Sequence, residues 1–146
     1  MKIAVKEVGK ELQIVETFDK YRSDCTKFFT GEKQRAEFVK LNADGTFCLG
    51  VNEEGLMREL PVNFLIETTN AYFPIQKMVG TAVFVRTKYA DPWVQEIYDF
   101  EVDDLTQEDL ILINHILDKK YQKQLEDQFE DYGKGYFVID DLGKKI

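Results

Sequence analysis

Apolar and charged residues alternate in the first segments of the chain, a pattern typical of β-strands. Two such segments, 2–8 and 12–17, flank Gly9 and predict a β-hairpin. The continuous apolar run at 80–86 has the length of a buried strand and is the best candidate for the centre of a sheet. Residues 94–103 alternate again and predict a further strand.

Turn-forming residues divide the middle of the chain. Asn, Asp and Gly gather at 42–45 and at 52–55, where tight turns need positive φ angles. We therefore expect a three-stranded meander over 35–60, ended by Pro61, because proline cannot donate a hydrogen bond to a ladder. The pattern over 62–78 favours neither helix nor strand.

A short helix is predicted near the N-terminus. Between residues 18 and 30, large apolar residues recur at spacings of three and four, which is one face of an amphipathic helix. These residues are Phe18, Tyr21, Cys25, Phe28 and Phe29. Gly31 follows them and is a common kind of helix stop.

A longer helix is predicted over 106–131. Thr106 and Asp109 have the spacing of a capping box, and Gly133 closes the pattern. Its apolar face comprises Leu110, Ile113, Leu117, Tyr121, Leu125, Phe129 and Tyr132. A final strand is expected at 135–139. Together these elements predict an α+β fold, with a mostly antiparallel sheet, a short helix in the N-terminal half and one long C-terminal helix packed on the sheet.

Composition indicates one domain over residues 1–146. Apolar residues make up 44% of the chain, and neither a linker nor a membrane-spanning segment is visible. Without a secretory signal we expect a cytoplasmic location in a bacterial host. In that reducing compartment Cys25 and Cys48 should be free thiols, and their apolar neighbours predict that both are core residues.

The net charge of −8 is unevenly distributed. Residues 1–90 hold 13 basic and 12 acidic residues, whereas residues 91–146 hold 6 basic and 15 acidic residues. A strongly acidic C-terminal third argues against direct binding of nucleic acid, whose phosphates need a basic surface. It permits binding to a basic surface of another protein.

The acidic third has two features that fit an interaction surface. Acids cluster near the predicted end of the long helix, where the helix dipole disfavours them. These acids are Glu126, Asp127, Glu130 and Asp131, and the alternative explanation is that they only keep the protein soluble. Just before the acidic third, Tyr89 and Trp93 are either anchors for a partner or a cover over a small core.

The sequence offers little for catalysis. Asp99, Glu101 and Asp103 would share one face of a strand, so they are a weak candidate for a metal site, but the simpler explanation is that they face water. The chain has a single histidine, His115, and no phosphate-binding or nucleophile motif. We therefore predict no catalytic residue, no metal and no cofactor.

Two motifs carry a resemblance to a known family. Residues 51–56 (Val-Asn-Glu-Glu-Gly-Leu) are followed by residues 60–63 (Leu-Pro-Val-Asn). With the apolar run at 80–85 and the segment 104–109, they resemble an uncharacterised family, a domain of unknown function, of small proteins encoded by phages and conjugative elements of Gram-positive bacteria. The resemblance covers about residues 1–117. It implies a mobile-element context and supplies no activity or functional residues.

These observations predict a non-catalytic accessory protein of a phage or mobile element. Its acidic C-terminal third would bind a basic host protein, such as a nuclease or another nucleic-acid-binding protein, and could inhibit host defence as an anti-CRISPR or anti-restriction protein does. One alternative is a small-molecule binder that uses Lys77, Arg86 and Lys88 for a nucleotide or signal. The others are a metal-dependent enzyme that uses the carboxylates above and a purely structural subunit.

Overall fold

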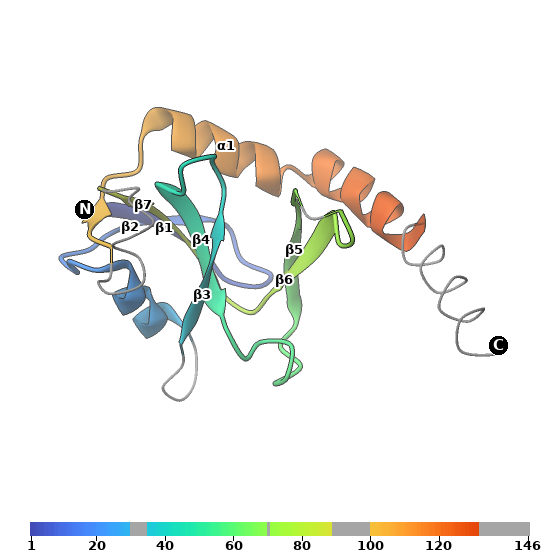
Figure 1. The fold of residues 1–146 in the computed structure, drawn as a ribbon, viewed down its shortest axis with the longest axis horizontal. Helices are drawn as coiled ribbons and strands as arrows, with labels where there is room; N and C mark the ends of the chain where they lie inside the picture. Colours follow the sequence, from blue (N-terminus) through green and yellow to red (C-terminus); the bar gives the residue numbers. More distant parts are fainter. Residues whose placement is uncertain (30–34, 70, 89–99, 132–146) are drawn as a thin grey trace.

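The computed structural model describes residues 1–29, 35–69, 71–88 and 100–131 (Figure 1). Its largest element is a six-stranded sheet in which every pairing is antiparallel. The strands are β1 (Lys2–Lys6), β2 (Gln13–Glu16), β3 (Ala36–Lys40), β4 (Phe47–Asn52), β7 (Ala82–Thr87) and β8 (Val102–Asp103). Their order is β2-β1-β7-β4-β3, and β8 adds to the end of β7. The apolar run that was predicted as the central strand forms β7, which lies in the middle of this order. Strand β3 lies at an edge.

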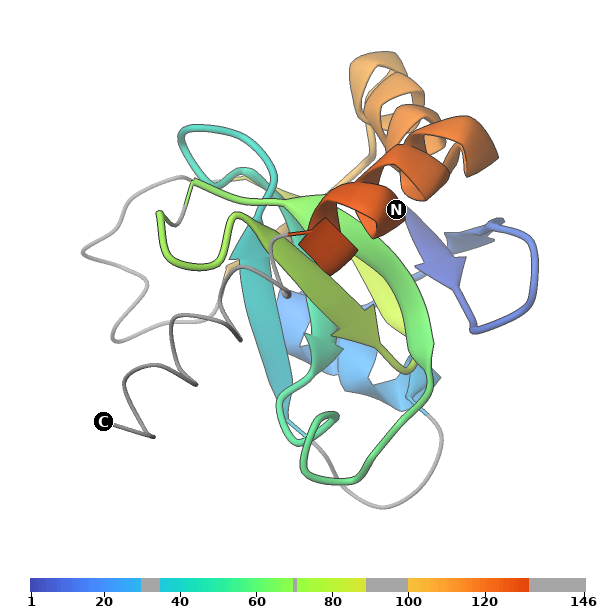
Figure 2. The same cartoon turned by 90° about the vertical axis from the view of Figure 1, so that its right-hand side faces the viewer.

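The two faces of this sheet are covered by different elements. A separate hairpin of β5 (Val62–Glu67) and β6 (Ile75–Val79) packs on one face together with helix α1 (Gln107–Leu117). Figure 1 shows α1 crossing above the strands, and Figure 2 shows the later helical segment, in dark orange to red, at the upper end of the green β5–β6 hairpin. The opposite face is covered by a short 3-10 helix, η1 (Arg22–Phe28). The α+β class predicted from the sequence is confirmed.

Two apolar clusters fill the spaces between these layers. The first joins Leu49 and Phe84 of the sheet to Phe64 of β5 and Ile113 of α1. In it the Phe64 and Phe84 rings stack with their centroids 5.8 Å apart. The second lies under η1 and contains both cysteines, which are buried free thiols as predicted.

The long C-terminal helix is present but interrupted. α1 ends at Leu117, and Asp118 adopts φ −59° and ψ 129° before residues 119–131 continue as a second helix, called here the distal helix. Asp118 caps this second helix, because its carboxylate accepts a hydrogen bond from the main-chain N–H of Tyr121 at 3.0 Å. The prediction of one continuous helix over 106–131 was wrong at this position. The break changes the direction of the chain, so that the distal helix packs on the β5–β6 hairpin.

The short N-terminal helix begins later than predicted. Tyr21 is still extended and bridges to Glu101, and the N–H of Arg22 donates to the carbonyl of Phe100 at 3.0 Å. These contacts hold the chain outside a helix until residue 22. Phe18, predicted on the buried helix face, is consequently 95% exposed.

The predicted meander has two strands rather than three. β3 and β4 pair as expected, but residues 53–59 form turns and the next strand begins only after Pro61. Glu59 has φ +55°, and the N–H of Leu60 donates to the carbonyl of Gly55 at 3.0 Å, which closes the turn. The segment 62–78, whose pattern was ambiguous, forms most of the β5–β6 hairpin.

The motif behind the family resemblance has a structural role. Asn63 donates to the carbonyls of Lys6 at 2.7 Å and Gly80 at 2.9 Å, and so ties β5 to β1 and to the turn before β7. Asn52 is buried, and its side chain accepts from the N–H of Glu54 at 2.9 Å. At Gly55 an added Cβ would lie only 2.6 Å from Val79, so only glycine fits there without movement of its neighbours. These residues shape the turn and hairpin that start the second layer.

Several sequence predictions fall on other parts of the chain. Most of the predicted strand 94–103 and the whole of the strand 135–139 lie outside the described residues, as does the expected helix stop at Gly133. Within the described residues, no helix is long and apolar enough to cross a membrane.

Candidate functional site

The distal helix is attached to the body by one apolar face. Leu125 is 1% exposed and packs with Leu65 and Ile75 of the β5–β6 hairpin, and Tyr121 and Phe129 flank this contact. All five belong to one cluster that is separate from the two main cores. The helical spacing of Tyr121, Leu125 and Phe129, visible in the sequence, therefore predicted its buried face correctly.

A glutamine strengthens this attachment. The side-chain amide of Gln122 accepts from the N–H of Leu65 and donates to its carbonyl, both at 2.9 Å, and also donates to the carbonyl of Ile116 at 2.6 Å. Gln122 thus takes the place of a neighbouring strand on the outer edge of β5. Sequence reasoning missed this residue, because a glutamine within a polar helix face has no distinguishing pattern.

The four predicted acids lie on the other side of the distal helix. Glu126, Asp127, Glu130 and Asp131 are all exposed, so the attachment leaves them free to face water. Among them, the only ion pair in the described part of the chain joins Asp127 to Lys123 at 3.3 Å. Hydrogen bonding and charge attraction from Asp127 raise the pKa of Lys123, and the charges of Glu126 and Glu130 add to this effect.

Charge is distributed unfavourably along this helix. Its lysines, Lys119, Lys120 and Lys123, come in the first turns, where the helix dipole disfavours positive charge. Its acids come later and form two like-charged pairs four residues apart, Glu126/Glu130 and Asp127/Asp131. Each such pair costs roughly 0.2–0.5 kcal/mol of helix stability. The packing of Leu125 and the Gln122 hydrogen bonds offset these terms.

The other predicted site residues are only partly within the structure. Tyr89, Trp93 and Asp99 lie outside the described residues. Glu101 pairs with Lys20 at 3.3 Å and with Lys88 at 3.6 Å, and Asp103 accepts a hydrogen bond from the N–H of Asp104 at 2.8 Å. In the described part of the chain, no three His, Cys, Asp or Glu side chains are grouped so as to hold a metal ion.

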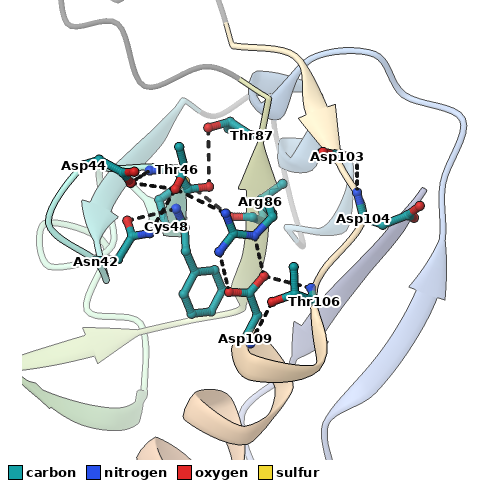
Figure 3. A network of polar contacts seen from close by, with 12 residues as sticks. Asn42, Asp44, Thr46, Cys48, Arg86, Thr87, Asp103, Asp104, Thr106 and Asp109 are labelled. Atoms are coloured by element: carbon teal, nitrogen blue, oxygen red, sulfur yellow. Dashed lines mark hydrogen bonds and ion pairs between the residues drawn. The ribbon is translucent and has the colours of Figure 1, made fainter.

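A cluster of polar side chains joins α1 to the centre of the sheet (Figure 3). Arg86 of β7 donates from Nε and Nη2 to the two oxygens of Asp109, at 2.6 and 2.7 Å. Asp109 is 3% exposed, and it completes the predicted capping box by exchanging hydrogen bonds with Thr106 at 2.9 and 3.1 Å. Burial alone would raise the pKa of Asp109, but the hydrogen bonds from Arg86 and Thr106 outweigh it and lower that pKa.

The same cluster extends into the β3–β4 turn. Arg86 also donates to the hydroxyl of Thr46 at 3.2 Å, and that hydroxyl donates to Asp44 at 2.6 Å. Asn42 donates to the same hydroxyl at 2.9 Å and accepts from the N–H of Phe47 at 3.1 Å. Figure 3 shows these side chains converging between the turn, β7 and the start of α1. This arrangement positions α1 on the sheet.

The three basic residues proposed for a small-molecule site each contact a different side chain of the protein. Arg86 is bound to Asp109, and Lys88 pairs with Glu101 at 3.6 Å. Lys77 lies over the ring of Phe129, 4.9 Å from its centroid, and so helps to attach the distal helix. Each cation has a structural contact, and these contacts do not favour the small-molecule alternative.

A groove of about 1070 Å³ opens beside the distal helix. It lies between edge strand β3, the ends of β5 and β6, and α1. His115 of α1 and Tyr121 of the distal helix line it with ring centroids 4.4 Å apart. The hydroxyl of Tyr121 donates to Glu67, and burial together with this carboxylate raises the pKa of Tyr121 to about 12. No local sequence pattern indicates that His115, Tyr121 and Glu67 meet.

Comparison with known proteins identifies no relative. No protein-family model, no curated protein and no solved structure matches the chain.

Proposed function

We propose that this chain is a non-catalytic protein-binding domain whose acidic distal helix docks on a basic surface of another protein. The observation that carries this proposal is the separation of two faces on one helix. The face with Tyr121, Leu125 and Phe129 attaches to the β5–β6 hairpin, whereas Glu126, Asp127, Glu130 and Asp131 are exposed.

The acids contribute little to the fold. Of the four, Asp127 alone has an ion pair in the described structure, and both partners are exposed, so the pair contributes little to stability. The like-charged pairs act in the opposite direction. Local rules are most often broken where a function requires it, which favours a binding role for these charges.

The sequence suggests one specific form of this function. A row of carboxylates on a helix can occupy a cationic groove that otherwise holds phosphates. With the resemblance to a phage and mobile-element family, this suggests a host nuclease or another nucleic-acid-binding protein as the partner. Inhibition of host defence, of the anti-CRISPR or anti-restriction kind, would follow from occupying that groove.

A capture experiment with matched variants tests the proposal. The tagged chain is incubated with bacterial lysate at about 0.01 M salt and then washed at about 0.5 M, which shortens the screening length from about 30 Å to roughly 4 Å. We expect a basic protein that is retained at low salt and released at high salt. The double variant Glu126→Gln/Glu130→Gln should lose it.

The control removes the same charge from the body of the protein. Glu11 and Glu53 are exposed and lie outside the acidic third, so Glu11→Gln/Glu53→Gln should retain the partner. If both double variants lose the partner equally, only net charge matters and the proposed surface is wrong. Capture that is unaffected by Glu126→Gln/Glu130→Gln would also refute it.

A further inference from the structure

Strand β3 is an edge strand with hydrogen-bonding groups directed away from the sheet. Among the described residues β4 is the one strand that pairs with it, and the N–H of Leu41 donates to the carbonyl of Phe47 at 2.9 Å. At the other end the N–H of Glu53 donates to the carbonyl of Arg35, also at 2.9 Å. Because hydrogen-bonded and non-hydrogen-bonded pairs alternate in an antiparallel ladder, residues 35, 37, 39 and 41 point their main-chain groups toward β4.

The alternate residues of β3 point the other way. The main-chain N–H and C=O groups of Ala36, Phe38 and Lys40 face the open edge, and no strand among the described residues pairs with them. The edge of β5 is different, since the side chain of Gln122 satisfies Leu65 there. In the described part of the chain, a side chain covers the edge of β5 and the edge of β3 is open, a ready template for another strand.

The groove described above lies along this open edge. Its volume of about 1070 Å³ is slightly larger than the roughly 300–1,000 Å³ that binding pockets span. Val39 of β3, Ile66 of β5, and Leu112 and Ile116 of α1 give it an apolar floor. A strand added to β3 would place every second side chain over this floor and so continue the first core cluster.

Charged side chains restrict what can bind. Glu37 shares the face of β3 that carries Val39, and Glu67 lies on the far side of the groove. Both are carboxylates, so basic residues are favoured beside them, whereas Lys40 lines the same groove and disfavours a basic residue beside it. Lys40 is exposed, and a lysine on an edge strand discourages indiscriminate pairing with apolar strands.

We propose that β3 accepts an extended segment of another protein as an added strand. The segment would turn apolar residues toward Val39 and Ile116 and basic residues toward Glu37 and Glu67. Main-chain hydrogen bonds to Ala36, Phe38 and Lys40 would supply much of the affinity, and the alternating side chains would supply specificity. This proposal does not depend on the acidic distal helix, since none of that helix's four acids lines the groove.

Amide hydrogen exchange of the full-length chain, followed by NMR, tests the proposal directly. In the free protein we expect slow exchange at Glu37, Val39 and Leu41, and fast exchange at Phe38 and Lys40. The probe is an eight-residue peptide of alternating lysine and valine, added at millimolar concentration. We expect it to slow exchange at Phe38 and Lys40 at least tenfold, whereas a peptide of alternating glutamate and valine should not.

A proline substitution separates main-chain from side-chain effects. Lys40→Pro removes an N–H that points away from β4, so the β3–β4 ladder should survive while one donor to the added strand is lost. Lys40→Ala keeps that N–H and is the matched control. We expect the peptide to bind Lys40→Ala about as well as the parent chain, and Lys40→Pro at least fivefold more weakly.

Three results would overturn the proposal. Slow exchange at Phe38 and Lys40 in the free, monomeric protein would mean that the chain's own residues already cover the edge. Protection that rises with protein concentration, together with dimer formation in ultracentrifugation, would make a second copy the occupant. No change at either amide with the lysine–valine peptide would show that the edge does not accept a basic strand.

Discussion

The carboxylate at the start of α1 and those on the distal helix differ in burial and in their bonding partners. At the start of α1, Asp109 is buried and accepts hydrogen bonds from Nε and Nη2 of Arg86 and from the N–H of Thr106. On the distal helix, Glu126 and Glu130 are exposed, and the described structure contains no ion pair to either. The first carboxylate is required by the packing of α1 on the sheet. The second group can be removed without leaving any buried charge uncompensated.

This difference shows why charge counts alone say little about function. Both groups belong to the acidic third that the sequence singles out, yet one stabilises the fold and the other opposes it slightly. A carboxylate with its hydrogen-bonding capacity filled internally has little left for a partner. The exposed acids of the distal helix keep that capacity, which is why we assign the binding surface to them.

Removal of Asp109 should have the largest effect. Asp109→Ala leaves Arg86 partly buried and without its carboxylate, which typically costs about 3–5 kcal/mol. Urea unfolding followed by circular dichroism measures the loss. Asp127→Asn, which removes an exposed ion pair, is the control and should lower the free energy of unfolding far less than Asp109→Ala does. Equal losses in the two variants would contradict the assignment of Asp109 to the fold.

Removal of the Gln122 amide should have the second largest effect. Gln122→Ala leaves the N–H and carbonyl of Leu65 without these hydrogen bonds, and we expect a loss of about 1–3 kcal/mol in the attachment of the distal helix. Hydrogen exchange at residues 119–131 should speed up more than exchange in β7. If hydrogen exchange speeds up equally at residues 119–131 and in β7, the distal helix unfolds only together with the sheet.

Acidification should weaken the buried ion pair between Arg86 and Asp109. Since the pKa of Asp109 is held below its ordinary value of 3.8, its contribution to stability is complete above about pH 4 and is lost as the pH falls through the folded-state pKa. Urea unfolding between pH 2.5 and 7 should show that the free energy of unfolding falls below pH 4. This fall should be shallower in Asp109→Asn than in the parent chain. Hydrogen bonds from Lys27 and Thr46 also lower the pKa values of Asp19 and Asp44, so some decline should remain. Identical slopes in the two proteins would contradict the ion-pair argument.

Neutralising the exposed acids should have the smallest effect on stability and the opposite sign. Glu126→Gln/Glu130→Gln removes one like-charged pair, so we expect a gain of at most about 0.5 kcal/mol in the free energy of unfolding. Thermal unfolding at low salt measures it, and high salt should abolish the difference. A loss above about 1 kcal/mol would mean that these acids help to hold the fold.

The sequence predicted those features that depend on local pattern. The apolar run of β7, the first hairpin and the apolar face of the C-terminal helices all follow from periodicity, and the Thr106–Asp109 capping box from spacing. The break at Asp118 could have been found, because aspartate is a favoured N-cap residue. Contacts between distant segments left no such signal. Arg86 and Asp109 are 23 residues apart, and Gln122 reaches Leu65 across 57.

The most direct test of the proposed function is the rate at which the captured partner associates with the chain. The variant Glu126→Gln/Asp127→Asn/Glu130→Gln/Asp131→Asn should fold as stably as the parent chain and bind the partner at least tenfold more slowly at low salt, while dissociation changes less. At about 0.5 M salt the two proteins should associate at similar rates. An unchanged association rate at low salt would contradict the assignment of the acidic distal helix as the docking surface.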